Sequence, residues 1–93
     1  MTNRSVIEVR AVPGDRGWAC EVTVKAEGET THHSVTVSAA DLERSGAGRP
    51  VEDLVRRSFE FLLEHEPPGS ILRRFDLAVI QRYFPEYDQR FRR

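Results

Sequence analysis

Hydrophobic and polar side chains alternate along three early stretches of the chain, at about residues 5–12, 17–26 and 31–38. A period of two places successive side chains on opposite faces, which is typical of a β-strand with one buried face. Turn-forming residues separate the stretches at 13–16 and 27–30. We therefore predict three β-strands. The side chains assigned to their shared apolar face are Ile7, Val9, Ala11, Trp18, Cys20, Val22, Val24, Ala26, His33, Val35 and Val37.

The pairing of these strands can be predicted from the turns between them. A two-residue type II′ turn at 28–29, with glycine first, places Val22 opposite Val35. A four-residue loop at 13–16 places Ile7 opposite Val22. Apolar side chains then meet across both hairpins. The pattern predicts a three-stranded antiparallel meander with one core face and one face in water.

Residues 51–65, VEDLVRRSFEFLLEH, carry the strongest helical pattern in the chain. Pro50 suits the first helical position, and the acidic residues 52–53 complement the positive end of the helix dipole. Residues 67–69, Pro-Pro-Gly, end the helix. We expect this helix to cover the apolar face of the sheet. Apolar or small side chains recur at i, i+3, i+4 and i+7, and these are Val51, Leu54, Val55, Ser58, Phe61, Leu62 and His65, with Phe59 and Leu63 widening the face.

Shorter helices are predicted on both sides of this segment. Ser38 gives a capping-box-like start to a helix at 39–45. A helical region follows at 71–84, where Asp76 caps the part after a brief first turn, and a last helix is expected at 86–91. Because strands come first and helices after, we predict an α+β fold in which the helices pack on one sheet face. The chain of 93 residues is expected to form a single domain.

Composition and charge narrow the expected environment. The net charge is −1, with 31% charged and 39% hydrophobic residues, so nothing general attracts the protein to nucleic acid or an anionic membrane. No run of about 18 apolar residues occurs, so we expect no membrane span. The N-terminal residues lack the apolar core of a signal peptide, and the single cysteine excludes an internal disulfide. These features predict a cytoplasmic protein.

Metal binding and catalysis receive little support from the sequence. His32 and His33 are adjacent in a predicted strand, so their rings point to opposite faces and do not chelate one ion easily. Cys20 and a histidine form a nominal nucleophile and base, but Cys20 belongs to the predicted core face. No motif for nucleophilic, metal-dependent or phosphate chemistry occurs. We expect no metal, no cofactor and no enzymatic activity, and keep an enzyme using Cys20 as a third alternative.

Arginine clusters raise a nucleic-acid-associated or antitoxin-like regulatory role as the second alternative. Arg73, Arg74, Arg92 and Arg93 would make the contacts. Elsewhere in the predicted helices, glutamates interleave with the arginines at positions 52–66, and i,i+4 ion pairs on a solvated helix explain those charges as well. A phosphate-binding face normally shows a clear local excess of positive charge. Nucleic acid is therefore possible but is not the favoured partner.

The end of the chain favours protein–protein interaction. It is dense in residue types that are common at binding hot spots, namely Arg82, Tyr83, Phe84, Tyr87, Arg90 and Phe91. The aromatic residues either pack back across the helix at 51–65 or form an interface with a partner or a second copy. An edge strand at 5–12 or 31–38 offers a second route, through strand addition. We predict a non-enzymatic interaction module, homodimeric or an accessory subunit.

Residues 58–87, SFEFLLEHEPPGSILRRFDLAVIQRYFPEY, resemble the C-terminal half of a group of small uncharacterised bacterial proteins. In that group an S-F-x-F-L-L-E-x-E-P segment precedes S-I-L-x-x-F-D-L-x-V-I-x-x-Y-F-P-E-Y. The resemblance covers about a third of the chain. It implies a bacterial, cytoplasmic protein, and it carries no activity, cofactor or partner.

Overall fold

In the part of the chain that the structure describes, a four-stranded sheet and three α-helices make up the fold. The computed structural model describes residues 5–26, 28–45 and 48–84. The strands are β1 (Val6–Pro13), β2 (Gly17–Ala26), β3 (Glu29–Ser38) and β4 (Arg74–Asp76), in the spatial order β1-β2-β3-β4. The helices are α1 (Ala39–Ser45), α2 (Val51–His65) and α3 (Ala78–Tyr83), with a 3₁₀ turn, η1, at Pro68–Ser70.

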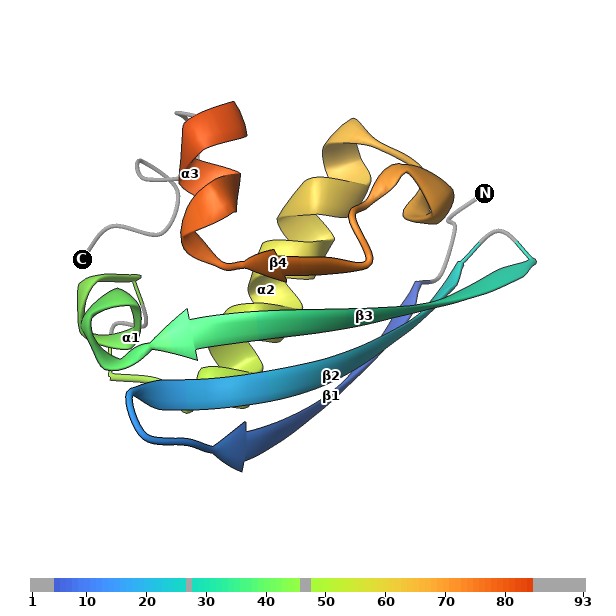
Figure 1. The fold of residues 1–93 in the computed structure, drawn as a ribbon. Helices are drawn as coiled ribbons and strands as arrows, with labels where there is room; N and C mark the ends of the chain where they lie inside the picture. The colour runs from blue at the N-terminus through green and yellow to red at the C-terminus, as the bar shows by residue number, and fades with distance from the viewer. Residues whose placement is uncertain (1–4, 27, 46–47, 85–93) are drawn as a thin grey trace.

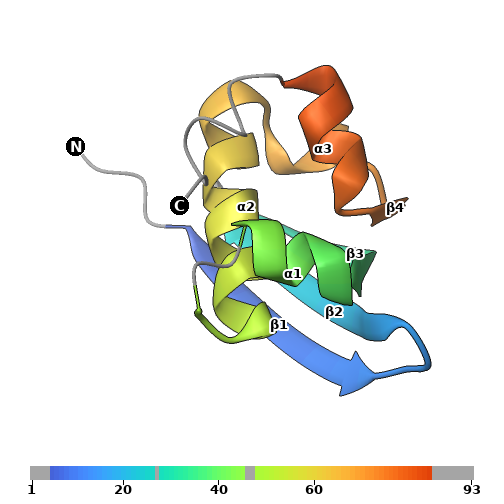
Figure 2. The same ribbon diagram turned by 90° about the vertical axis from the view of Figure 1, so that its left-hand side faces the viewer.

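Strands β1 to β3 form the predicted antiparallel meander. The helix α2 lies across one face of this sheet, while the opposite face carries no described element (Figures 1 and 2). Alternate apolar side chains of the strands are buried together with those of α2. The α+β class is therefore confirmed. The sheet is mixed, however, because β4 pairs with β3 in parallel. Buried apolar side chains at the core of the sheet–helix contact are Val22, Val24, Val35, Val37, Leu54, Val55, Phe59 and Phe61.

Both hairpins differ from the predicted register by two residues. Val22 lies opposite His33 and Val9, whereas the turns led us to expect Val35 and Ile7. The assignment of side chains to the two faces is still correct, because a shift of two residues keeps each side chain on its own side of the sheet. In the second hairpin Gly28 has a φ of +79°, one position later in the turn than predicted.

A close backbone contact fixes the first hairpin. The Gly14 N–H donates to the Gly17 carbonyl oxygen at 2.7 Å, which moves the loop from 13–16 to 14–17. At Gly17 the backbone of β3 lies so close that an added Cβ would overlap the Val37 carbonyl oxygen. A glycine is therefore required where β2 begins.

The helical region predicted at 71–84 is wrong in its first part. The residues before Leu77 form an extended segment that ends in β4, and only Ala78–Tyr83 is helical. Two backbone hydrogen bonds explain the strand: the Ser34 N–H donates to the Arg73 carbonyl at 2.7 Å, and the Leu77 N–H donates to the Thr36 carbonyl at 2.9 Å. These groups point away from β2, so β4 satisfies donors and acceptors that β3 would leave unpaired.

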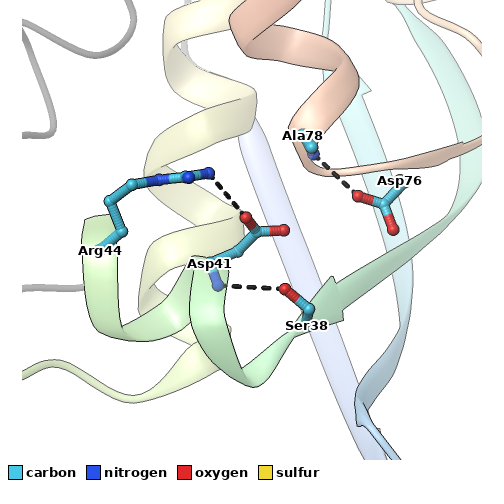
Figure 3. A network of polar contacts seen from close by, with 5 residues as sticks. All are labelled: Ser38, Asp41, Arg44, Asp76 and Ala78. Atoms are coloured by element: carbon cyan, nitrogen blue, oxygen red, sulfur yellow. Dashed lines mark hydrogen bonds and ion pairs between the residues drawn. The ribbon is translucent and has the colours of Figure 1, made fainter.

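The two residues predicted as caps both accept backbone N–H hydrogen bonds at the start of the short helices, although the N-cap residue of α3 is Leu77 and not Asp76. The Ser38 hydroxyl accepts from the Asp41 N–H at 3.1 Å at the start of α1, and Asp76 accepts from the Ala78 N–H at 3.0 Å at the start of α3 (Figure 3). Asp41 also pairs with Arg44 at 2.8 Å. The helix α2 has the predicted bounds, although Pro50 is its N-cap residue and not its first helical residue. The helix expected at 86–91 lies outside the described residues.

Candidate functional site

An apolar cavity of about 250 Å³ lies between the C-terminal half of α2, the segment after η1, β4 and α3. We call it the α2–α3 cavity. Glu66 and Ser70 are the polar residues among those that line it. The apolar lining residues are Leu62, Ile71, Leu72, Phe75, Val79, Ile80, Tyr83 and Phe84. Three buried lining residues, Leu62, Ile71 and Ile80, also belong to the core, so the cavity is built on the packed part of the fold.

Two large side chains of this lining remain in water. Tyr83 is 71% exposed and Leu72 is 53% exposed. The neighbouring Arg82 is also exposed and makes no ion pair with the residues that the structure describes. Tyrosine and arginine are residue types enriched at binding hot spots, and here an exposed tyrosine lines the cavity with an exposed arginine beside it in the sequence.

The predicted interface residues divide into three groups. Arg82 and Tyr83 are exposed at the C-terminal part of α3. Phe84 packs against the core side of α2, where its ring centroid lies 5.7 Å from that of Phe61 and 4.9 Å from that of His65. Tyr87, Arg90 and Phe91 lie outside the described residues. Leu72 was missed because it directly follows the buried Ile71, and no periodicity distinguishes an exposed leucine there.

His33 is a buried link between β3 and the segment before β4. It is 2% exposed, and its ring lies 5.3 Å from the Phe59 ring. Its Nδ1–H donates to the Leu72 carbonyl at 2.8 Å, and its Nε2 accepts from the Thr31 hydroxyl at 2.9 Å. A carbonyl only accepts, so the neutral ring carries its proton on Nδ1. These bonds hold the residues that form one wall of the cavity against the sheet.

Burial lowers the pKa of His33 below its ordinary value of 6.5. The positive charges of His32 and Arg73 act in the same direction, and the hydrogen bond to the Leu72 carbonyl opposes them. The neutral form is the one that fits this site.

Cys20 does not have the surroundings of a nucleophile. It is buried in the core, and burial raises the pKa of its thiol to about 11, with Glu52 and Glu21 adding to the rise. No group of three metal-binding side chains comes together among the described residues. His32 and His33 lie on opposite faces of β3, as predicted, with His32 exposed and His33 in the core.

The arginines of the nucleic-acid alternative do not stand apart from carboxylates. Arg74 lies on the open face of the sheet, opposite Ser34, and Asp76 follows on the same face. Ser34 itself donates to Glu21 at 3.2 Å. The positive charge of Arg74 is therefore flanked by acidic side chains on that face. Arg73, the predicted residue just before β4, is exposed, and its backbone carbonyl accepts from the Ser34 N–H. Arg92 and Arg93, the other two residues of the predicted set, lie outside the described residues.

Comparisons with protein-family models, characterised proteins and solved structures found no match. The resemblance of residues 58–87 to a bacterial group stays a prediction. None of the described helices combines the length and the apolar character needed to cross a bilayer.

Proposed function

We propose that this protein is a non-enzymatic interaction module whose α2–α3 cavity receives an apolar side chain of a partner protein. The observation that carries the proposal is the exposure of Tyr83 and Leu72 beside an apolar cavity. Isolated exposed hydrophobic residues are ordinary on protein surfaces, but two large ones bordering a cavity mark a contact site.

The size of the cavity favours a side chain as its occupant. Sites for small molecules usually measure about 300–1,000 Å³, and a cavity of about 150 Å³ is enough for a six-membered aromatic ring. At about 250 Å³, the α2–α3 cavity matches one large aliphatic or aromatic side chain. The partner segment would therefore insert a single anchor residue and lie along α3.

Charge adds a second requirement for the partner. Arg82 stands next to Tyr83 and has no acidic partner within the described part of the chain. A guanidinium in that position pairs well with a carboxylate, which fixes orientation as well as sign. We propose a partner segment in which an acidic residue lies beside the apolar anchor.

Peptide binding to the full-length, isotope-labelled protein tests this proposal. The probes are short synthetic peptides that contain one tryptophan flanked by aspartates, with matched peptides in which lysines replace the aspartates. We expect the acidic peptide to shift the amide resonances of Ile71, Val79 and Tyr83. The variant Tyr83→Ser is expected to weaken binding about tenfold, as truncation of a hot-spot residue does. A matched control is Thr30→Ser, an exposed residue of β3 that does not line the cavity.

Three outcomes would contradict the proposal. The peptide shifts could lie elsewhere on the protein, Tyr83→Ser could leave the affinity unchanged, or the lysine peptides could bind as well as the acidic ones. A fourth outcome identifies a different occupant. If only the double variant Tyr87→Ala/Phe91→Ala binds the peptide, the chain's own C-terminal residues occupy the cavity in the intact protein.

A further inference from the structure

Among the described residues, strand β1 is a long edge of the sheet with no further strand beside it. It runs over eight residues, whereas β4, at the opposite edge, has three (Figure 1). The backbone groups of β1 that point away from β2 have no strand beside them in the described structure. A free edge of this length is a template for another strand.

The hydrogen-bonding pattern shows which residues of β1 face outward. Gly14 and Gly17 form a hydrogen-bonded pair, because the Gly14 N–H donates to the Gly17 carbonyl oxygen. The pair Val12 and Ala19 lies two residues further along the same register. In an antiparallel ladder the paired residues that exchange hydrogen bonds alternate with those that do not. The even-numbered residues of β1 therefore direct their N–H and C=O groups toward β2.

The odd-numbered residues consequently present their backbone groups at the edge. These are Ile7, Val9 and Ala11. A side-chain contact agrees, because Arg56 Nε donates to the Ile7 carbonyl oxygen at 3.3 Å from outside the β1–β2 ladder. Val9 is thus the central residue of the free edge, with both of its backbone groups available for a further strand.

The open-face side chains of β1 form a self-complementary series. In order along the strand they are Val6, Glu8, Arg10 and Val12, all exposed. The two valines at the ends are 48% and 49% exposed. If a second copy of this series runs antiparallel beside the first, Glu8 lies opposite Arg10 and Val6 lies opposite Val12.

We propose that two copies of this chain pair through β1, antiparallel and centred on Val9. Val9 of each copy would exchange both backbone hydrogen bonds with Val9 of the other, which continues the sheet across a twofold axis. Glu8 then lies opposite Arg10, and Val6 lies opposite Val12. The symmetry repeats each of these pairs, so the interface contains two ion pairs and two apolar contacts.

Neighbouring registers are less favourable for physical reasons. Centring on Glu8 sets this carboxylate against its own copy, and centring on Arg10 sets two guanidinium groups together. Like charges directly opposite each other destabilise a strand pair. Centring on Ala11 requires an N–H from Pro13, which has none. The charges that discourage indiscriminate edge pairing therefore select one register.

Arg56 is compatible with this pairing. In the dimer the Ile7 carbonyl accepts from Ala11 of the second copy. A carbonyl oxygen has two lone pairs, so the exposed Arg56 side chain can share it or withdraw. The β1 edge alone carries this proposal, which does not depend on occupation of the α2–α3 cavity.

Charge reversal tests the register directly. The mass of the full-length chain is measured by analytical ultracentrifugation between about 10 μM and about 1 mM, a range that reports weak dimers. We expect a concentration-dependent dimer. Glu8→Arg and Arg10→Glu each create two like-charge contacts, so each is expected to raise the dissociation constant about tenfold or more. Mixed together, the two variants should form a heterodimer, because every charge pair becomes complementary again.

Controls separate loss of pairing from loss of folding. Glu29→Arg makes the same charge change on β3 and should leave the dimer intact. Val9→Pro removes an outward N–H that the monomer does not use, and should abolish the dimer while the protein remains folded by circular dichroism.

A wild-type chain that stays monomeric up to about 1 mM overturns the proposal. So does a dimer that Glu8→Arg leaves unchanged, or a mixture of the two charge variants that fails to associate. Glu8, Val9 and Arg10 do not line the α2–α3 cavity, so we expect their substitution to leave peptide binding there unchanged, and the two proposals fail separately.

Discussion

Acidification should destabilise the folded protein through His33, the buried histidine that joins β3 to the segment before β4. At neutral pH its ring makes hydrogen bonds to Leu72 and Thr31 and contacts Phe59. Replacement by glutamine keeps a polar side chain but loses the ring contact and one of the two bonds. We expect His33→Gln to lower the free energy of unfolding by about 2 to 3 kcal/mol at pH 7.

The sign of the pH effect follows from the lowered pKa of His33. Below pH 6.5 a histidine in the unfolded chain binds a proton that the folded protein excludes from this site. The contribution of neutral His33 to the free energy of unfolding is therefore fully present above the pKa of this histidine in the unfolded chain. It is lost as the pH falls from that value toward the lower pKa in the folded protein. One group contributes a slope of at most about 1.4 kcal/mol per pH unit in that interval.

Urea unfolding at a series of pH values measures this slope. The comparison stays above about pH 5, where carboxylates contribute little. We expect the wild-type free energy of unfolding to decrease as the pH is lowered from 6.5 to that limit. In His33→Gln we expect the free energy to fall less steeply with pH, by up to the slope that one group contributes. His32→Gln, on the exposed face of the same strand, is the control. If His33→Gln keeps the full wild-type slope, the buried neutral histidine does not cause the acid sensitivity and the reasoning is refuted.

Three further substitutions test the packing that positions the site, each by chemical denaturation. Gly17→Ala should destabilise the protein by about 3 kcal/mol because its Cβ overlaps the backbone of β3. Gly14→Ala should change stability by less than about 0.5 kcal/mol, because its Cβ meets only the Gly17 carbonyl oxygen, at an ordinary contact distance of 3.8 Å. Phe59→Ala removes a fully buried ring and should cost about 4 kcal/mol; a cost below about 1 kcal/mol would contradict the described core. Asp76→Ala removes the cap of α3 and should cost about 1 kcal/mol, with no loss if the cap does not form in solution.

The strands and the central helix could be predicted because their signals are local and repeated. Alternation over eight or ten residues identified β1 to β3, and the 3.6-residue period gave the bounds of α2. Ser38 and Asp76 were recognisable as caps because each stands directly before an apolar helical pattern. In these segments the residues that determine the structure are neighbours in sequence.

The fourth strand and the cavity could not be predicted in this way. β4 contains one apolar residue, Phe75, between two charged ones, which is too short a pattern to distinguish from a turn. It becomes a strand because Ser34 and Thr36 of β3, about forty positions away, supply its hydrogen bonds. The α2–α3 cavity forms between elements whose contacts depend on that placement. Periodicity carries no information about either.

The register of the hairpins and the proposed pairing of β1 have the same physical origin. An apolar alternation is unchanged when a strand slides by two residues, so it assigns faces but not partners. Inside the chain the turns remove this ambiguity, as the Gly14–Gly17 hydrogen bond does for the first hairpin. Between two chains no turn exists, and only the side-chain pairs decide. The order of Glu8 and Arg10 makes one alignment attractive and the neighbouring alignments repulsive. Charged side chains can therefore specify the register between two molecules, as the loops specify it within one chain.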